Sequence, residues 1–316
     1  MPPHRTRLAP SPTGALHLGN VRTFLVNFLL ARQSGWQVLM RVEDLDGPRV
    51  RRGAAEGMLE ELAWLGLAWD GPVTYQSQRG PAYQAALRQL IEIGAVYPCT
   101  CSRKDVEDSA GAPHAEDAAV TYPGTCRGRF ASAEQASAAT GRPVAWRVRV
   151  EEEPIEFRDA FAGPRRFNLA RQGGDFVVFK NADQAAYQLA VVADDAEAGV
   201  DRIVRGDDLL DSAARQIHLR RLLGLGGDVE YWHLPLVVGS DGRRLAKRHG
   251  DTRLAHYRAA GATSQRILGL LGYWSGLLDR RREADVDELQ SAFDTGRLPR
   301  GLVVFGRADD DFLRGR

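Results

Sequence analysis

The segment from Arg7 to Asn20 constrains the possible folds most strongly. Residues 5–9 predict a short buried strand, and the proline-stiffened turn at 10–12 leads into an apolar helix. A strand, a tight turn and a helix in this order leave the N–H groups of the helix start, together with His17, beyond the end of the strand. The segment therefore predicts a phosphate site in an α/β fold.

The alternating pattern continues along the next eighty residues. Residues 37–42 predict a second strand, which ends in the carboxylates of 43–46, and helices are predicted over 52–65 and 80–94. The carboxyl ends of strands are where open α/β sheets bind their ligands. The first hundred residues therefore predict a β-α-β-α order with a parallel sheet.

The second half of the chain returns to strands after a stretch of low periodicity. Strands are predicted at 146–150, 175–180, 187–192 and 203–205, with a helix at 212–223. This order is typical of the second half of a split nucleotide-binding fold. Residues 252–274 predict helix, and the arginine-rich remainder to 316 predicts irregular structure, whose arginines have two open roles: contact with RNA phosphates or a solvated tail.

A basic loop late in the chain complements the N-terminal segment. Residues 244–248, Arg-Leu-Ala-Lys-Arg, follow the turn Gly239-Ser-Asp-Gly242 and place Lys247 among other cations. A mobile cation opposite a phosphate-binding helix start is what the formation of an adenylate from ATP requires. The two segments together predict activation of a substrate by a nucleotide.

Composition excludes several classes of protein. With 316 residues, of which 44% are hydrophobic, the chain can bury a large core, and a net charge of +1 gives no general field for polyanions. There is no apolar run long enough to span a membrane and no apolar N-terminal leader. We expect a cytoplasmic protein, and nothing in the sequence requires more than a monomer.

Three cysteines, Cys99, Cys101 and Cys126, lie in one short stretch. Their odd number argues against a disulfide framework, and their spacing predicts a three-sulfur zinc site that needs a fourth ligand. Ligand chemistry favours His114, because imidazole is a far commoner zinc ligand than phenol, and Tyr122 is the rival. The alternative is three reduced cysteines without a metal.

In these motifs the chain resembles the class I aminoacyl-tRNA synthetases, and within them the catalytic half of glutamyl-tRNA synthetase. The resemblance covers about residues 5–255 and implies an α/β fold with a Rossmann-like parallel sheet. The matching segments stand in the order of that family, at 7–14, 41–46, 187–195, 203–208 and 244–248. The expected domains are the first catalytic half at 1–94, a zinc-binding insertion at 95–145, the second catalytic half at 146–250 and a short helical region at 251–316.

The cysteine segment narrows the resemblance. Cys99-x-Cys101 with Tyr122-Pro-Gly-Thr-Cys126 is similar to the zinc site of the glutamyl-queuosine tRNA(Asp) synthetases, which are short paralogues. This resemblance, and not ligand chemistry, moves the expected fourth ligand from His114 to Tyr122. The zinc ion would be structural, because four protein ligands leave no open position. Too few residues follow position 248 for a full anticodon-binding domain.

The resemblance also implies roles for single residues. Asn20 stands where the HIGH signature has its second histidine, and Ala246 stands where the KMSKS signature has serine. His17 and Lys247 are the expected catalytic residues. The expected ATP contacts are His17, Asn20 and Lys247, and the expected glutamate contacts are Arg7, Ser11, Glu43, Tyr187 and Arg205.

The implied activity has two steps. ATP with Mg²⁺ would activate glutamate without tRNA, and the glutamyl group would pass to the cyclopentenediol of queuosine in the anticodon loop of tRNA(Asp). No side chain is identified as the proton acceptor of the second step. Two alternatives stay open: a truncated glutamyl-tRNA synthetase that charges the 3′ end of tRNA(Glu), and a non-catalytic tRNA-binding paralogue.

Overall fold

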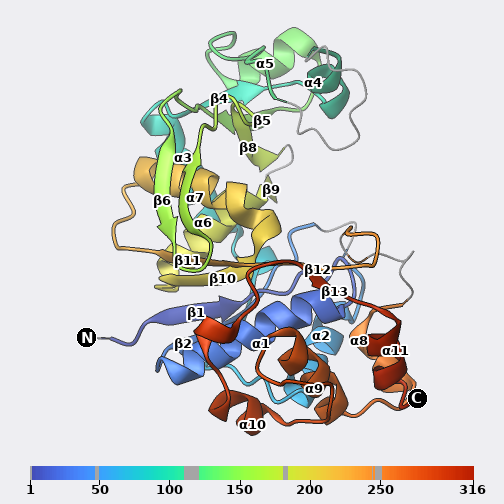
Figure 1. The fold of residues 1–316 in the computed structure, drawn as a ribbon. Helices are drawn as coiled ribbons and strands as arrows, with labels where there is room; N and C mark the ends of the chain where they lie inside the picture. Colours follow the sequence, from blue (N-terminus) through green and yellow to red (C-terminus); the bar gives the residue numbers. More distant parts are fainter. Residues whose placement is uncertain (1, 47–49, 110–120, 181–183, 244, 246–250) are drawn as a thin grey trace.

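A computed structural model describes residues 2–46, 50–109, 121–180, 184–243, 245 and 251–316. Its centre is a parallel sheet (Figure 1). Strands β1 (Arg5–Leu8), β2 (Gln37–Val42) and β3 (Val73–Tyr75) pair in parallel, and so do β10 (Arg202–Gly206) and β11 (Glu230–Leu234). The N–H of Asp201 donates to the carbonyl of Arg5 at 3.1 Å, so β10 lies beside β1. The predicted parallel sheet is confirmed.

Helix α1 (Leu18–Gln33) lies against one face of this sheet. The sheet covers one side of α1, and α9 (Ser264–Trp274) and α10 (Val286–Ser291) cover the other. A helix that is buried on both sides needs apolar residues around most of its circumference, and α1 has them. Helix α2 (Ala54–Trp64) contributes Leu62 to the same core. The start of α1 is thereby fixed at the carboxyl end of β1.

A second unit lies at the other end of the molecule (Figure 1). Four antiparallel strands form a sheet in the order β4 (Val96–Cys99), β5 (Ala145–Val148), β8 (Phe176–Lys180) and β9 (Gln184–Ala185). The short helices α4 (Arg103–Ser109) and α5 (Ala133–Thr140) lie beyond it. A hairpin of β6 (Ile155–Asp159) and β7 (Gly163–Phe167), which the sequence analysis did not predict, runs back toward β11.

One strand prediction is wrong. Residues 187–192 form the first half of helix α6 (Tyr187–Glu197), which packs against α3 (Gly80–Glu92) and α7 (Leu210–Leu222). A short apolar run with adjacent valines suits a buried helix as well as a strand, and periodicity cannot separate the two. The N-cap residue, Ala186, makes no side-chain cap bond and so gave no helix-start signal.

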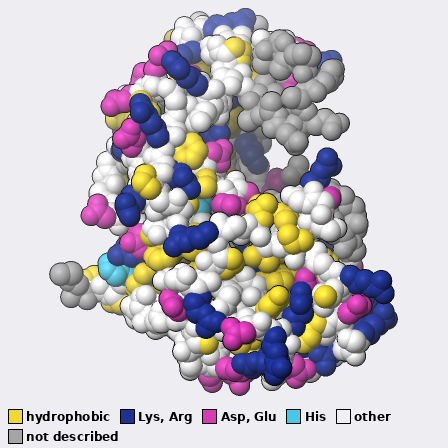
Figure 2. All heavy atoms as spheres, viewed as in Figure 1, with side chains coloured by type: hydrophobic (Ala, Val, Ile, Leu, Met, Phe, Trp, Pro, Cys, Tyr) yellow, Lys and Arg dark blue, Asp and Glu magenta, His cyan; other side chains and the backbone are white. Residues whose placement is uncertain are grey.

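The C-terminal region is more regular than predicted. After α8 (Leu254–Ala259), α9 and α10, β13 (Val303–Val304) pairs in parallel with β12 (Val237–Val238), and α11 (Arg307–Leu313) ends the chain. Basic and acidic side chains are interspersed over this part in Figure 2. Several of its arginines form ion pairs within the fold: Arg281 with Asp309, Arg297 with Asp279, and Arg314 with Asp310.

In the part of the chain that the structure describes, no helix has the length and apolarity needed to cross a membrane.

Candidate active site

One cavity of about 520 Å³ opens at the carboxyl ends of β1 and β10. Its wall combines the turn after β1, the start of α1, the end of β2 and the start of α6. Seven of the eight residues predicted from the sequence to bind glutamate or ATP line it: Arg7, Ser11, His17, Asn20, Glu43, Tyr187 and Arg205. The eighth, Lys247, lies outside the described residues.

The start of α1 is built as a capping box around His17. The N–H of Asn20 donates to His17 Nδ1 at 3.4 Å, and Asn20 Oδ1 accepts from the N–H of His17 at 2.9 Å. The N–H of Leu18 also donates to the carbonyl of Thr252 at 3.0 Å, and Arg253 forms a β-bridge with His17. Residues Thr252 and Arg253, which follow the basic loop in the sequence, therefore lie directly against the N-terminus of α1, where the sequence predicted a phosphate site.

Buried charges from three elements meet behind Arg7 and Glu43, which line the cavity. Asp195 of α6 accepts from Arg7 Nε at 3.3 Å and from Arg41 NH1, and Arg41 NH2 donates to Glu43 Oε1 at 3.0 Å. Burial alone would raise the pKa of Asp195, but the guanidinium groups of Arg41 and Arg7 hold it below its ordinary value. Burial raises the pKa of Glu43, although Arg41 and Arg7 oppose that shift. Asp195 and Arg41 thus fix the positions of Arg7 and Glu43.

Arg205 is held from the opposite wall. Its Nε donates to His233 Nε2 at 2.9 Å and its NH1 donates to Gln216 Oε1 at 2.9 Å. His233 Nδ1 lies 2.6 Å from Asp159 Oδ2. The NH2 group of Arg205 is buried and has no hydrogen-bond partner among the described residues. Tyr187, at the first position of α6, lines the same cavity and is 36% exposed.

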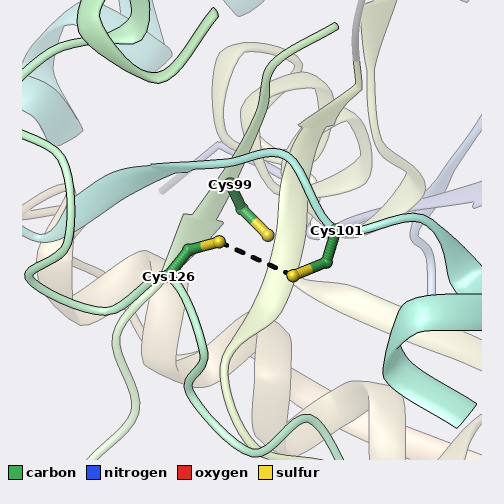
Figure 3. A group of neighbouring side chains, drawn as sticks. All are labelled: Cys99, Cys101 and Cys126. Carbon is green, nitrogen blue, oxygen red and sulfur yellow. Dashed lines mark hydrogen bonds between the residues drawn. The ribbon is translucent and has the colours of Figure 1, made fainter. Parts of the chain in front are cut away.

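The three cysteines converge as predicted (Figure 3). Their sulfur atoms all lie within 4.8 Å of one another, and Cys101 Sγ and Cys126 Sγ are 3.5 Å apart. Tyr122 Oη lies 3.5 Å from Cys99 Sγ and 3.9 Å from Cys101 Sγ. Sulfurs around a tetrahedral zinc ion are about 3.8 Å apart, given Zn–S bonds of about 2.3 Å. The donor set and its spacing therefore fit zinc.

A cation stands beside this cluster. Arg147 of β5 donates from Nε to Cys99 Sγ at 3.3 Å, and its guanidinium carbon lies 3.8 Å from the centre of the Tyr122 ring. Three thiolates and a phenolate around Zn²⁺ would leave a negative site, which this guanidinium would offset. His114, the other candidate ligand, lies outside the described residues.

Comparison with known proteins places the chain in a family. The family described as class I tRNA synthetases (E and Q), catalytic domain, matches residues 4–305. A glutamyl-Q tRNA(Asp) synthetase of Symbiobacterium thermophilum is 45% identical over 307 residues, which cover 94% of each chain. One from Nocardia farcinica is 47% identical over 93% of this chain and 90% of its own. The chain belongs to the glutamyl-Q tRNA(Asp) synthetase family of class I synthetases.

Solved structures agree with this membership. A glutamate tRNA ligase of Elizabethkingia meningosepticum, determined in complex with its amino acid, superposes with a TM-score of 0.82. It is 25% identical and the match covers 98% of this chain and 68% of the ligase. The predicted α/β class I fold and the resemblance to the glutamyl-Q family are confirmed, and the chain is a ligase.

Several residues at this site were not predicted from the sequence. Arg41 and Asp195 lie within segments that carried the resemblance but received no role, since only the fold shows that they bridge Arg7 and Glu43. Lys180, at the end of β8, also lines the cavity and lies 3.9 Å from Asp46. Its only sequence signal was its place at the end of a predicted strand.

Proposed function

We propose that this synthetase activates glutamate with ATP in the absence of tRNA and transfers the glutamyl group to the cyclopentenediol of queuosine in the anticodon loop of tRNA(Asp). The observation that carries the proposal is the convergence of two arginines and one carboxylate, Arg7, Arg205 and Glu43, on a cavity beside the start of α1. The names of the relatives support the choice of amino acid and of RNA.

The charges of the cavity complement glutamate. Two guanidinium groups, from Arg7 and Arg205, match the two carboxylates of the amino acid, and Glu43 offers a carboxylate to its ammonium group. Tyr187 would form a wall of the pocket, and Ser11 would donate a hydrogen bond. A simple dicarboxylate lacks the ammonium partner of Glu43, so the site would select an amino acid.

ATP would lie with its phosphates at the start of α1. The side chains of His17, Asn20 and Lys247 would contact it there, at the positive end of the helix dipole. The α-carboxylate of glutamate attacks the α-phosphorus, the bond to the bridging oxygen of pyrophosphate breaks, and glutamyl adenylate forms. Because the attacking carboxylate is already ionised, this step needs no general base. Mg²⁺ would neutralise phosphate charge, and positioning would supply most of the acceleration.

The second step transfers the glutamyl group. A hydroxyl of queuosine attacks the carbonyl carbon of the mixed anhydride, AMP leaves with the electrons of the broken bond, and the hydroxyl proton is released to solvent. A structural Zn²⁺, held by Cys99, Cys101, Tyr122 and Cys126, would pin the insertion without an open coordination position.

The test offers labelled glutamate and ATP to the purified protein with tRNA(Asp) that carries or lacks queuosine, and with tRNA(Glu). We expect label only on the queuosine-containing tRNA(Asp), and exchange of pyrophosphate into ATP with glutamate alone. Label on tRNA(Glu) only would identify a charging synthetase instead. No label and no exchange would identify a non-catalytic RNA-binding protein.

A further inference from the structure

Arg205 is the end of a buried line of hydrogen bonds that reaches across three strands. It lies on β10, His233 lies on β11, and Asp159 ends β6. All three side chains are at most 5% exposed. Arg205 Nε to His233 Nε2 measures 2.9 Å, and His233 Nδ1 to Asp159 Oδ2 measures 2.6 Å.

The direction of each bond follows from chemistry. A guanidinium N–H can only donate, so His233 Nε2 must accept and the ring proton must sit on Nδ1, from which it donates to Asp159. Asp159 Oδ1 is occupied as well, because it accepts from the N–H groups of Phe161 at 3.0 Å and Ala162 at 2.6 Å. Burial lowers the pKa of His233, which agrees with a neutral ring. The carboxylate therefore dictates the tautomer of the histidine.

A second set of bonds holds the other side of the guanidinium. NH1 of Arg205 donates to Gln216, whose Nε2 donates to Gln188 Oε1 at 3.1 Å. Gln188 in turn donates to Ser212 Oγ at 3.0 Å. Two of the three guanidinium nitrogens of Arg205 are thus bound to the protein. The third, NH2, is buried without a partner among the described residues, and Arg205 lines the cavity.

We propose that Asp159 and His233 are a positioning pair that fixes the guanidinium of Arg205 so that its NH2 group meets a carboxylate of the amino acid substrate. The inference rests on the proposed role of Arg205 in binding glutamate. Neither Asp159 nor His233 touches the substrate. They act by keeping one rotamer of Arg205 and by leaving its NH2 nitrogen for the ligand.

The sharpest test is Asp159→Asn. The amide oxygen can keep the backbone bonds of Oδ1, but its NH₂ group then faces His233 Nδ1 and forces the proton onto Nε2. Nε2–H would point at Arg205 Nε–H, two donors with no acceptor. A charged hydrogen bond of this kind corresponds to about ten- to a hundredfold in affinity, so we expect KM for glutamate to rise by about that factor. KM for ATP should stay within about threefold.

Histidine variants supply the rescue and the control. His233→Leu removes the acceptor and should raise KM for glutamate, whereas His233→Gln offers both an acceptor and a donor and should restore most of the affinity. His218→Gln is the matched control, because His218 is a partly buried histidine bonded to the carbonyl of Arg149 away from the cavity. Nitrogen-15 NMR of the rings should show His233 protonated at Nδ1 in the wild type and at Nε2 in Asp159→Asn.

The outcomes separate the positioning pair from the proposed function. If Arg205→Ala leaves KM for glutamate unchanged, Arg205 does not bind this substrate and both the assignment and the pair are wrong. If Arg205→Ala raises KM but His233→Leu does not, the proposed function stands and the pair is wrong. If Asp159→Asn does not fold, the comparison of His233→Leu with His233→Gln decides. If the variants raise KM for glutamate and KM for ATP by the same factor, Asp159 and His233 have a merely structural role.

Discussion

At the scale of single residues, the side chains expected to contact the substrate are held in place by other charged side chains, which do not contact it themselves. Arg7 and Glu43 were predicted through the family resemblance, because they stand in the matching segments 7–14 and 41–46. Asp195, which bridges Arg7 and Arg41, was not, because the residues before it were taken as a strand and only helix α6 turns its carboxylate toward the arginines. Pairing across 154 residues leaves no local pattern in the sequence.

The raised pKa of Glu43 predicts a pH dependence. Only the ionised carboxylate can pair with the ammonium group of glutamate, and burial shifts its protonation to higher pH than the ordinary value of 4.5. We therefore expect kcat/KM for glutamate in pyrophosphate exchange to fall as the pH is lowered, with an acid limb above the ordinary carboxyl range. Glu43→Gln should give a lower profile without that limb. An unchanged limb in the variant would assign the titration to another group.

At the scale of elements, long amphipathic or buried helices and strands with clear ends were predicted well, as α1 and β2 show. The failures have physical reasons. Helix α6 lacks a cap and carries β-branched residues, and the β6–β7 hairpin is too short and too rich in arginine to stand out. The hairpin matters for the site, since it brings Asp159 to His233.

Replacement of two helical glycines by alanine, one in α9 and one in α2, should have opposite effects on the stability of the fold. A Cβ on Gly269 would lie 1.7 Å from the carbonyl oxygen of Arg282, so Gly269→Ala must push two backbones apart and should lower the free energy of unfolding by about 1–3 kcal/mol or more. Gly57, within α2, has no neighbouring atom within 4 Å of a Cβ, and Gly57→Ala should raise it by about 0.5–1 kcal/mol. Urea denaturation measures both. Similar values for the two variants would contradict the close approach of α9.

The cysteine cluster predicts how the insertion depends on zinc. We expect one zinc ion per chain by elemental analysis, lost in Cys101→Ser and held less tightly against a chelator in Tyr122→Phe. Tyr97→Phe, which removes a nearby phenol bonded to Asp175, is the matched control and should keep its zinc. If Tyr122→Phe retains zinc as firmly as the control and His114→Ala does not, histidine is the fourth ligand.

At the scale of the whole molecule, the cavity belongs to neither half alone. His17 and Glu43 belong to the part of the chain that forms the parallel sheet and α1, and they line one cavity together with Lys180 of β8 and Tyr187 of α6. Sequence order predicts strands and helices, but not that segments so far apart close around one space. A ligand that touches both walls should therefore stabilise the complete fold.

This arrangement predicts the response to a stable analogue of glutamyl adenylate. At a free concentration one hundred times its Kd, the analogue should add about 2.7 kcal/mol to the free energy of unfolding. Thermal unfolding should show a smaller rise in Tm with AMP or glutamate alone, and Arg205→Ala should reduce the response to the analogue. An equal response to AMP and to the analogue would mean that the glutamyl end makes no contact.

The pairing of Leu18 with Thr252 also bears on how the protein is made. The start of α1 leaves the ribosome early, but its backbone partner is added roughly 230 residues later, which takes on the order of ten to fifty seconds at synthesis rates of about 5–20 residues per second. Contacts so distant in sequence form late and slow the folding of the chain. The start of α1 therefore lacks this backbone partner through most of synthesis, and the candidate active site is completed only when the last quarter of the chain emerges.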